Sequence, residues 1–142
     1  AEMTRVLPLA MLLAAALLSN GCATRSGESL VIDTREVVGV RYMPDELTDM
    51  LRELGYDWIP IVDPAIRQEV KSFRQDGEHH MRFEYLQTRQ VRIDARIRSR
   101  DGFTRLQFYE PDSQTLNPSS MALFQQLQER AALQFGAANI SR

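Results

Sequence analysis

The chain has 142 residues, 19 acidic against 17 Lys and Arg side chains, and one cysteine. A length of this kind suits one domain, and a net charge of −2 gives no overall basicity for nucleic acid, so we expect no nucleic-acid partner. One cysteine excludes a disulfide framework within the chain.

An uncharged apolar run extends from Val6 to Leu18, after Arg5 as a minimal positive segment. We expect translation to begin at Met3, with Ala1 and Glu2 outside the native sequence. The run is shorter than the roughly 20 residues of a membrane-spanning helix, which favours the apolar core of a signal peptide. An uncleaved short anchor, and ordinary signal cleavage after Ala16 or Ala23, are the alternatives.

Ser19-Asn20-Gly21-Cys22 ends this apolar segment, and small polar residues follow it. Between Met3 and about Arg25 the chain resembles the signal of bacterial lipoproteins, although Leu18 lies one position further from the cysteine than usual. The resemblance implies a signal peptide over residues 1–21 and a mature protein that begins at a lipidated Cys22, with palmitate-type acyl chains as its membrane anchor. Since Ala23 and not Asp follows, it also implies the outer membrane, facing the periplasm. Three buried acyl chains would exceed the two signals that stable anchoring needs.

Residues 22–29 then form a lipidated N-terminus and polar tether, and residues 30–142 form a single periplasmic domain. Alternating apolar residues predict a strand from Leu30 to Tyr42. A helix is predicted over Pro44–Leu54, with Gly55 at its end. Trp58–Val62 predicts a short strand at a sheet edge, because Pro60 cannot donate to a ladder.

Asp63-Pro64 indicates a second helix that ends near Asp76-Gly77, with a hairpin at Asp76-Gly77 as the alternative. Three strands are predicted next, over His80–Leu86, Val91–Ser99 and Phe103–Tyr109, before a last helix that begins at Asn117-Pro118 and ends at Gly136. The predicted fold class is α+β: a three-stranded antiparallel meander, plus one or two N-terminal strands, packed against two or three helices.

Matching apolar faces predict the strand registers. In the first hairpin, Arg82 lies opposite Asp94 and Glu84 lies opposite Arg92, which are favourable pairs. In the second hairpin, Asp101-Gly102 indicates a two-residue type I′ turn, which sets Arg98 directly opposite Arg105.

Four arginines remain without partners in these predicted hairpins: Arg96, Arg98, Arg100 and Arg105. They are the candidate site for an anion or an acidic partner, and the alternative is a solvated sheet face without function. Tyr56 and Trp58 are a second candidate, an exposed edge that accepts a partner strand, although core packing of Trp58 is the competing interpretation.

His79 and His80 are the only histidines, and neighbours in a strand point to opposite faces, so we expect no metal site. The usual catalytic motifs are absent, so we expect no catalytic residues, no enzymatic activity and no small-molecule cofactor. The sequence therefore predicts a lipid-anchored adaptor or accessory subunit of an envelope assembly, with an envelope protein as its partner. The alternatives are a binding module for an anionic polymer or lipid head groups and, more weakly, a hydrolase of unrecognised type.

Overall fold

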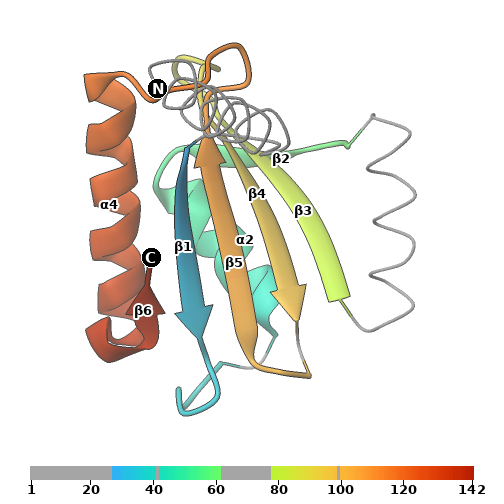
Figure 1. Cartoon of the computed structure of the whole chain (residues 1–142). Coiled ribbons are helices and arrows are strands. Elements are labelled where there is room, and N and C mark those ends of the chain that lie inside the picture. Colours follow the sequence, from blue (N-terminus) through green and yellow to red (C-terminus); the bar gives the residue numbers. More distant parts are fainter. Residues whose placement is uncertain (1–26, 41, 62–77, 99) are drawn as a thin grey trace, which may run out of the picture.

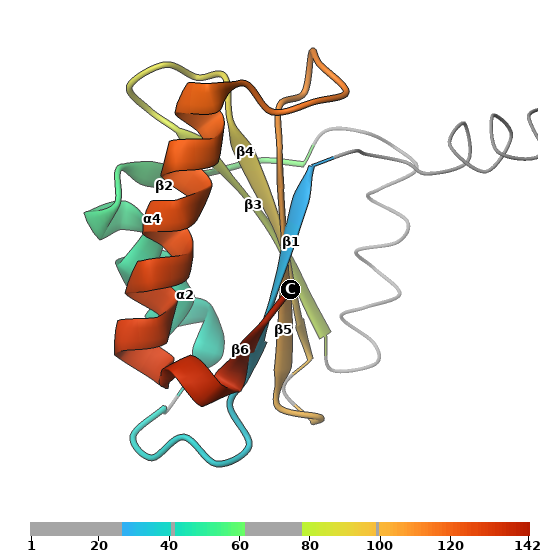
Figure 2. The same cartoon turned by 60° about the vertical axis from the view of Figure 1, so that its left-hand side comes forward.

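In the part of the chain that the computed structural model describes, six antiparallel strands form one sheet, and two helices lie against one of its faces (Figures 1 and 2). The structure describes residues 27–40, 42–61, 78–98 and 100–142. In chain order the main elements are β1 (Glu28–Asp33), α2 (Met43–Glu53), β2 (Tyr56–Ile59), β3 (Glu78–Tyr85), β4 (Arg92–Arg98), β5 (Phe103–Tyr109), α4 (Pro118–Phe135) and β6 (Ile140–Ser141). The described part is therefore a mixed α+β fold.

The predicted meander forms the centre of a larger sheet. Strands β3, β4 and β5 are neighbours, as expected, but the full order is β2-β3-β4-β5-β1-β6. Strand β1 pairs with β5, and the two-residue β6 pairs with Val31 and Ile32 of β1. The larger sheet corrects the three-stranded prediction, because these additional pairings join segments that are distant in the chain.

The core lies between the sheet and the two helices, which Figure 2 shows on the same side of the sheet. Alternate residues of the central strands are fully buried there, and Phe108 of β5 stacks at 5.4 Å between ring centroids on Phe124 of α4. Helix α2 contributes Leu47 and Leu51 to the same cluster. We call this helix-covered side the inner face.

Both ends of α2 and the beginning of α4 agree with the sequence prediction. Pro44 lies in the first turn of α2, and Gly55 follows the helix with a φ of 97°, a conformation that glycine adopts without strain. Asn117 caps α4, since its side chain accepts a hydrogen bond from the backbone N–H of Ser120 at 2.9 Å. Glu110 accepts from the side chains of both residues, which fixes the approach of the chain to α4.

The predicted strand Leu30–Tyr42 is wrong in its second half. Only β1 is extended, and the chain then turns, so that Val38 is 98% exposed. Val37 and Val40 pack partly against the core on either side of it, so their apolar spacing reflects a loop with two buried contacts. The predicted signal segment, Cys22 and the helix predicted from Asp63 to Gly77 lie outside the described residues.

Gly27 leads into β1 through a tight space. A Cβ atom at this position would lie 2.1 Å from the carbonyl oxygen of Phe108 and 3.1 Å from the Cβ of Tyr109. Only glycine allows the backbone to pass this close to β5 without a shift.

Candidate functional site

The side of the sheet opposite the helices, which we call the outer face, carries polar and charged side chains in cross-strand rows. One row contains His80 of β3, Arg96 of β4, Arg105 of β5 and Val31 of β1, each directly opposite the next. We call these four residues the arginine row. Arg96 and Arg105 are both exposed, and the row contains no acidic side chain. Like charges directly opposite each other destabilise a sheet, so this arrangement needs an explanation.

The neighbouring row toward the β4–β5 turn contains Glu78, Arg98, Phe103 and Asp33, and ion pairs neutralise its charges. Arg98 contacts Glu78 at 2.7 Å across the β3–β4 ladder and Asp101 at 3.2 Å in the following turn. On β1, Asp33 pairs with Arg35 at 2.8 Å, and the bonds from Arg35 hold the pKa of the Asp33 carboxyl below its usual value.

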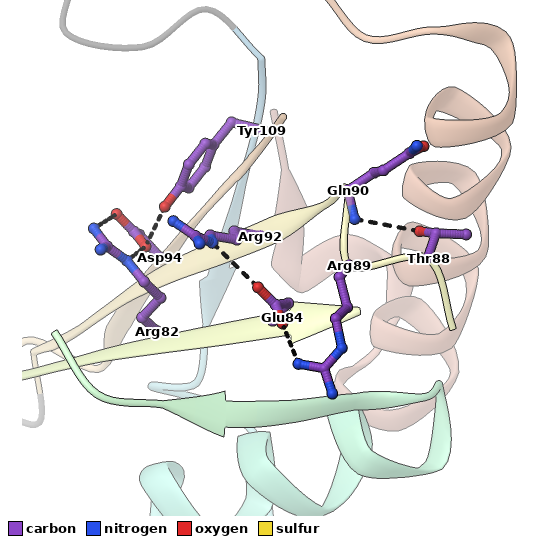
Figure 3. A network of polar contacts seen from close by, with 8 residues as sticks. All are labelled: Arg82, Glu84, Thr88, Arg89, Gln90, Arg92, Asp94 and Tyr109. Carbon is purple, nitrogen blue, oxygen red and sulfur yellow. Dashed lines mark hydrogen bonds and ion pairs between the residues drawn. The ribbon is translucent and has the colours of Figure 1, made fainter. Parts of the chain in front are cut away.

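The two rows on the other side form the polar network of Figure 3. Arg82 binds Asp94 through two N–H groups, at 2.7 and 3.1 Å, and Tyr109 donates its hydroxyl to Asp94 at 3.0 Å. Arg82 and Tyr109 are both nearly fully buried. Glu84 accepts from Arg89 and Arg92 at the end of the same face. The predicted pairs Arg82–Asp94 and Glu84–Arg92 are thus confirmed.

The register of the second hairpin differs from the prediction by two residues. Arg98 lies opposite Phe103, so four residues and not two connect β4 to β5, and Arg96 is the residue opposite Arg105. Gly102 donates to the carbonyl of Arg98 with a φ of 71°, so the glycine is the left-handed residue of a longer turn. A shift of two residues keeps every side chain on its predicted face.

This register divides the four candidate arginines. Arg96 and Arg105 lie together in the arginine row, whereas Arg98 contacts two carboxylates. Arg100 is exposed in the turn beyond β4. Within the part of the chain that the structure describes, Arg105 forms no ion pair. The polar contact of Tyr109 was missed at the sequence level, although the alternation of β5 places this residue on the outer face.

The second candidate is the edge at β2, and its two residues, Tyr56 and Trp58, differ in exposure. Strand β2 is an outermost strand of the sheet, as predicted from Pro60. The side chain of Tyr56 is buried against Tyr85, and burial raises the pKa of its hydroxyl. Trp58 is 52% exposed, so neither full burial nor full exposure describes it.

Asp57 closes part of this edge. Its carboxylate accepts the backbone N–H of Trp58 at 2.8 Å and contacts Arg52 of α2 at 3.2 Å. These two bonds, the backbone one first, lower the pKa of Asp57 below its usual value.

The two histidines lie on opposite faces, as strand geometry requires. His80 belongs to the arginine row, and His79 lies edge-on to Tyr42 at 5.9 Å between ring centroids. Among the described residues, no three His, Cys, Asp or Glu side chains are grouped to hold a metal ion. In that same part of the chain, neither helix has the length and apolar character needed to cross a membrane.

Comparison with known proteins identifies no matching family model, no matching curated protein and no matching solved structure. The functional argument therefore depends on the sequence and the structure of this chain alone.

Proposed function

We propose that the chain is a lipid-anchored protein of the bacterial cell envelope that acts as an adaptor or accessory subunit of a membrane or periplasmic assembly. The arginine row binds an acidic surface of an envelope protein partner. The observation that supports this proposal most directly is the placement of exposed Arg96 directly opposite exposed Arg105. Anchoring follows from the apolar run Val6–Leu18 and the lipobox-like residues that end at Cys22.

The arrangement of the arginine row suits an acidic partner for an electrostatic reason. Two cations held side by side raise the energy of the free sheet, and a carboxylate placed between them lowers it. Each guanidinium can also bind a carboxylate through two parallel hydrogen bonds, which fixes orientation as well as charge. Arginine is accordingly common among the residues that contribute most to protein interfaces.

The neighbouring rows support the same site because they limit it. Ion pairs occupy Arg98 on one side and Arg82 on the other, so these side chains hold the sheet and frame the arginine row. A partner that meets this face thus finds two exposed guanidinium groups, those of Arg96 and Arg105, on directly opposite residues.

A double variant, Arg96→Gln with Arg105→Gln, tests the proposal. In bacteria that express the full chain, chemical crosslinking should recover a specific envelope protein with the wild type and at least tenfold less of it with the variant. Arg130→Gln with Arg142→Gln is the matched control, because it removes the same charge from two arginines that do not belong to the arginine row and pair with Glu53 and Glu28. Equal recovery with the wild type and both variants would contradict the proposal.

The alternative ligand, an anionic polymer or lipid head group, gives a different result with the same variants. Binding of the purified chain to isolated peptidoglycan or to anionic vesicles would depend on Arg96 and Arg105 and would fall steeply with salt. A protein interface with an apolar centre would keep most of its affinity. Salt-sensitive binding to the polymer without a protein partner would replace the adaptor function.

Lipidation has its own test. The intact mass of the mature protein isolated from membranes should equal a chain that begins at Cys22 plus its acyl groups. A chain that begins at Thr24, or an unmodified Cys22, would overturn the anchoring proposal.

A further inference from the structure

The outer edge of β2 is a place where another strand would be expected to add. Edge strands present unpaired N–H and C=O groups, and natural proteins protect such edges with charged side chains and proline. β2 has only four residues, but it carries the one tryptophan of the chain, half-exposed, at the boundary of the sheet. How this edge is protected can be followed group by group.

The register shows which backbone groups point outward. Leu86 donates to the carbonyl of Gly55, and β2 and β3 are antiparallel with Asp57 opposite Glu84. Bonded positions alternate along an antiparallel pair, so Asp57 faces β3 through its backbone while Tyr56 and Trp58 direct their backbone groups to the open side. Pro60, which follows β2 directly, is the next outward position.

Two of these three outward positions cannot donate to a new strand. Pro60 has no N–H group. The N–H of Trp58 already donates to the carboxylate of Asp57 at 2.8 Å, and Arg52 contacts the same carboxylate oxygen from α2. The N–H of Tyr56 is the remaining donor of the edge.

We propose that Asp57, positioned by Arg52, blocks the β2 edge and prevents it from pairing with β2 of a second copy of this chain. The carboxylate acts twice: it occupies the Trp58 N–H, and in an antiparallel pairing centred on residue 57 it would lie opposite the same charge of the second copy. The depressed pKa of Asp57 is consistent with a carboxylate that stays ionised while it does so. This inference is independent of the proposed adaptor function. It concerns the edge of the sheet opposite to β6.

Trp58 provides the measurement, because it is the only tryptophan and reports on coverage of this edge alone. In the full chain, held in excess detergent, wild-type emission should be independent of protein concentration and readily quenched by acrylamide. Asp57→Ala should give a concentration-dependent blue shift and protection from quenching. Sedimentation should show dimers of the variant with a dissociation constant at least about tenfold below the highest concentration at which the wild type is still monomeric, which corresponds to a gain of at least about 1.4 kcal/mol in association free energy.

Two further variants identify the cause. Asp57→Asn keeps an oxygen that can accept the Trp58 N–H but removes the charge, so its self-association should lie between those of the wild type and Asp57→Ala. Asp112→Ala is the matched control, since it removes the same charge from an exposed loop that follows β5. Strands β3 and β4 separate β5 from β2 in the sheet. The proposal is overturned if folded Asp57→Ala stays monomeric at all concentrations, or if Asp112→Ala dimerises equally. Circular dichroism of each variant establishes that it is folded.

Discussion

The central strands supply two faces of one sheet, and the two faces are stabilised by different interactions. On the inner face, fully buried apolar side chains such as Phe83, Ile93 and Phe108 pack under α2 and α4. On the outer face, ion pairs such as Arg82–Asp94 link neighbouring strands instead. Apolar contacts do not depend on the direction in which two side chains approach each other. Cross-strand ion pairs form only when the strand register sets particular residues opposite each other. The comparison indicates that the inner face supplies most of the stability, whereas ion pairs on the outer face fix the register of β3 on β4 beside the candidate site.

The largest expected effect comes from opening the inner face. Phe108→Ala removes a fully buried ring that stacks on Phe124, so it should lower the free energy of unfolding by about 3–5 kcal/mol. Phe108→Leu, which keeps most of the volume, should lose less than half of that. Urea unfolding measures both. A loss below about 1 kcal/mol for Phe108→Ala would contradict the assignment of the core to this face.

Breaking the buried ion pair tests the outer face. Asp94→Ala removes the acceptor of two Arg82 N–H groups and of the Tyr109 hydroxyl, and should lower the free energy of unfolding by about 3 kcal/mol. Replacing both partners, Arg82→Met with Asp94→Leu, should recover most of this loss, because well-packed apolar residues do not leave a charge buried beside a missing partner. If the double variant were as unstable as Asp94→Ala, the ion pair would contribute more to the free energy of unfolding than the apolar pair Met and Leu can replace.

The smallest effects, and the sharpest contrast, lie within the outer face. Arg105→Gln relieves the repulsion from Arg96 and should raise the free energy of unfolding by about 0.5 kcal/mol. Arg98→Gln removes contacts to Glu78 and Asp101 and should lower it by a similar amount. Thermal unfolding of the two variants side by side measures the sign. If both variants lost stability, Arg105 would be a structural residue and not one retained at a cost for binding.

Local patterns determine most of the secondary structure, because they report on burial. The apolar spacing of α2 and α4 and the alternation of β3, β4 and β5 identified these elements, and complementary charges identified the register of β3 on β4. Patterns of this kind are read within one segment, so they gave no indication that β1 pairs with β5 or that β6 pairs with β1.

The candidate site was harder to predict than the fold for a related reason. Two registers that differ by two residues put the same side chains on the same face, so alternation cannot distinguish them. Three of the four arginines were therefore correctly placed on the outer face of the sheet, whereas Arg100 lies in the turn beyond β4. The residue opposite Arg105 was predicted as Arg98 and is Arg96. No sequence pattern predicts the hydrogen bond that the Trp58 N–H donates to the Asp57 carboxylate, since this bond depends on the rotamer of a single side chain.

The narrow passage at Gly27 determines which end of the sheet lies nearest to Cys22 along the chain. Four residues lie between Cys22 and Gly27, so the five Cα–Cα steps that connect them span at most about 18 Å, which would hold this end of the sheet near the lipid surface if Cys22 is lipidated. The turn after Tyr85 and the loop after Tyr109 lie at this same end of the sheet, while the turn after Arg98 lies at the far end of strands about 20 Å long. If Cys22 is lipidated as proposed, this short connection would keep the arginine row, midway along the strands, close to the membrane and to proteins anchored there.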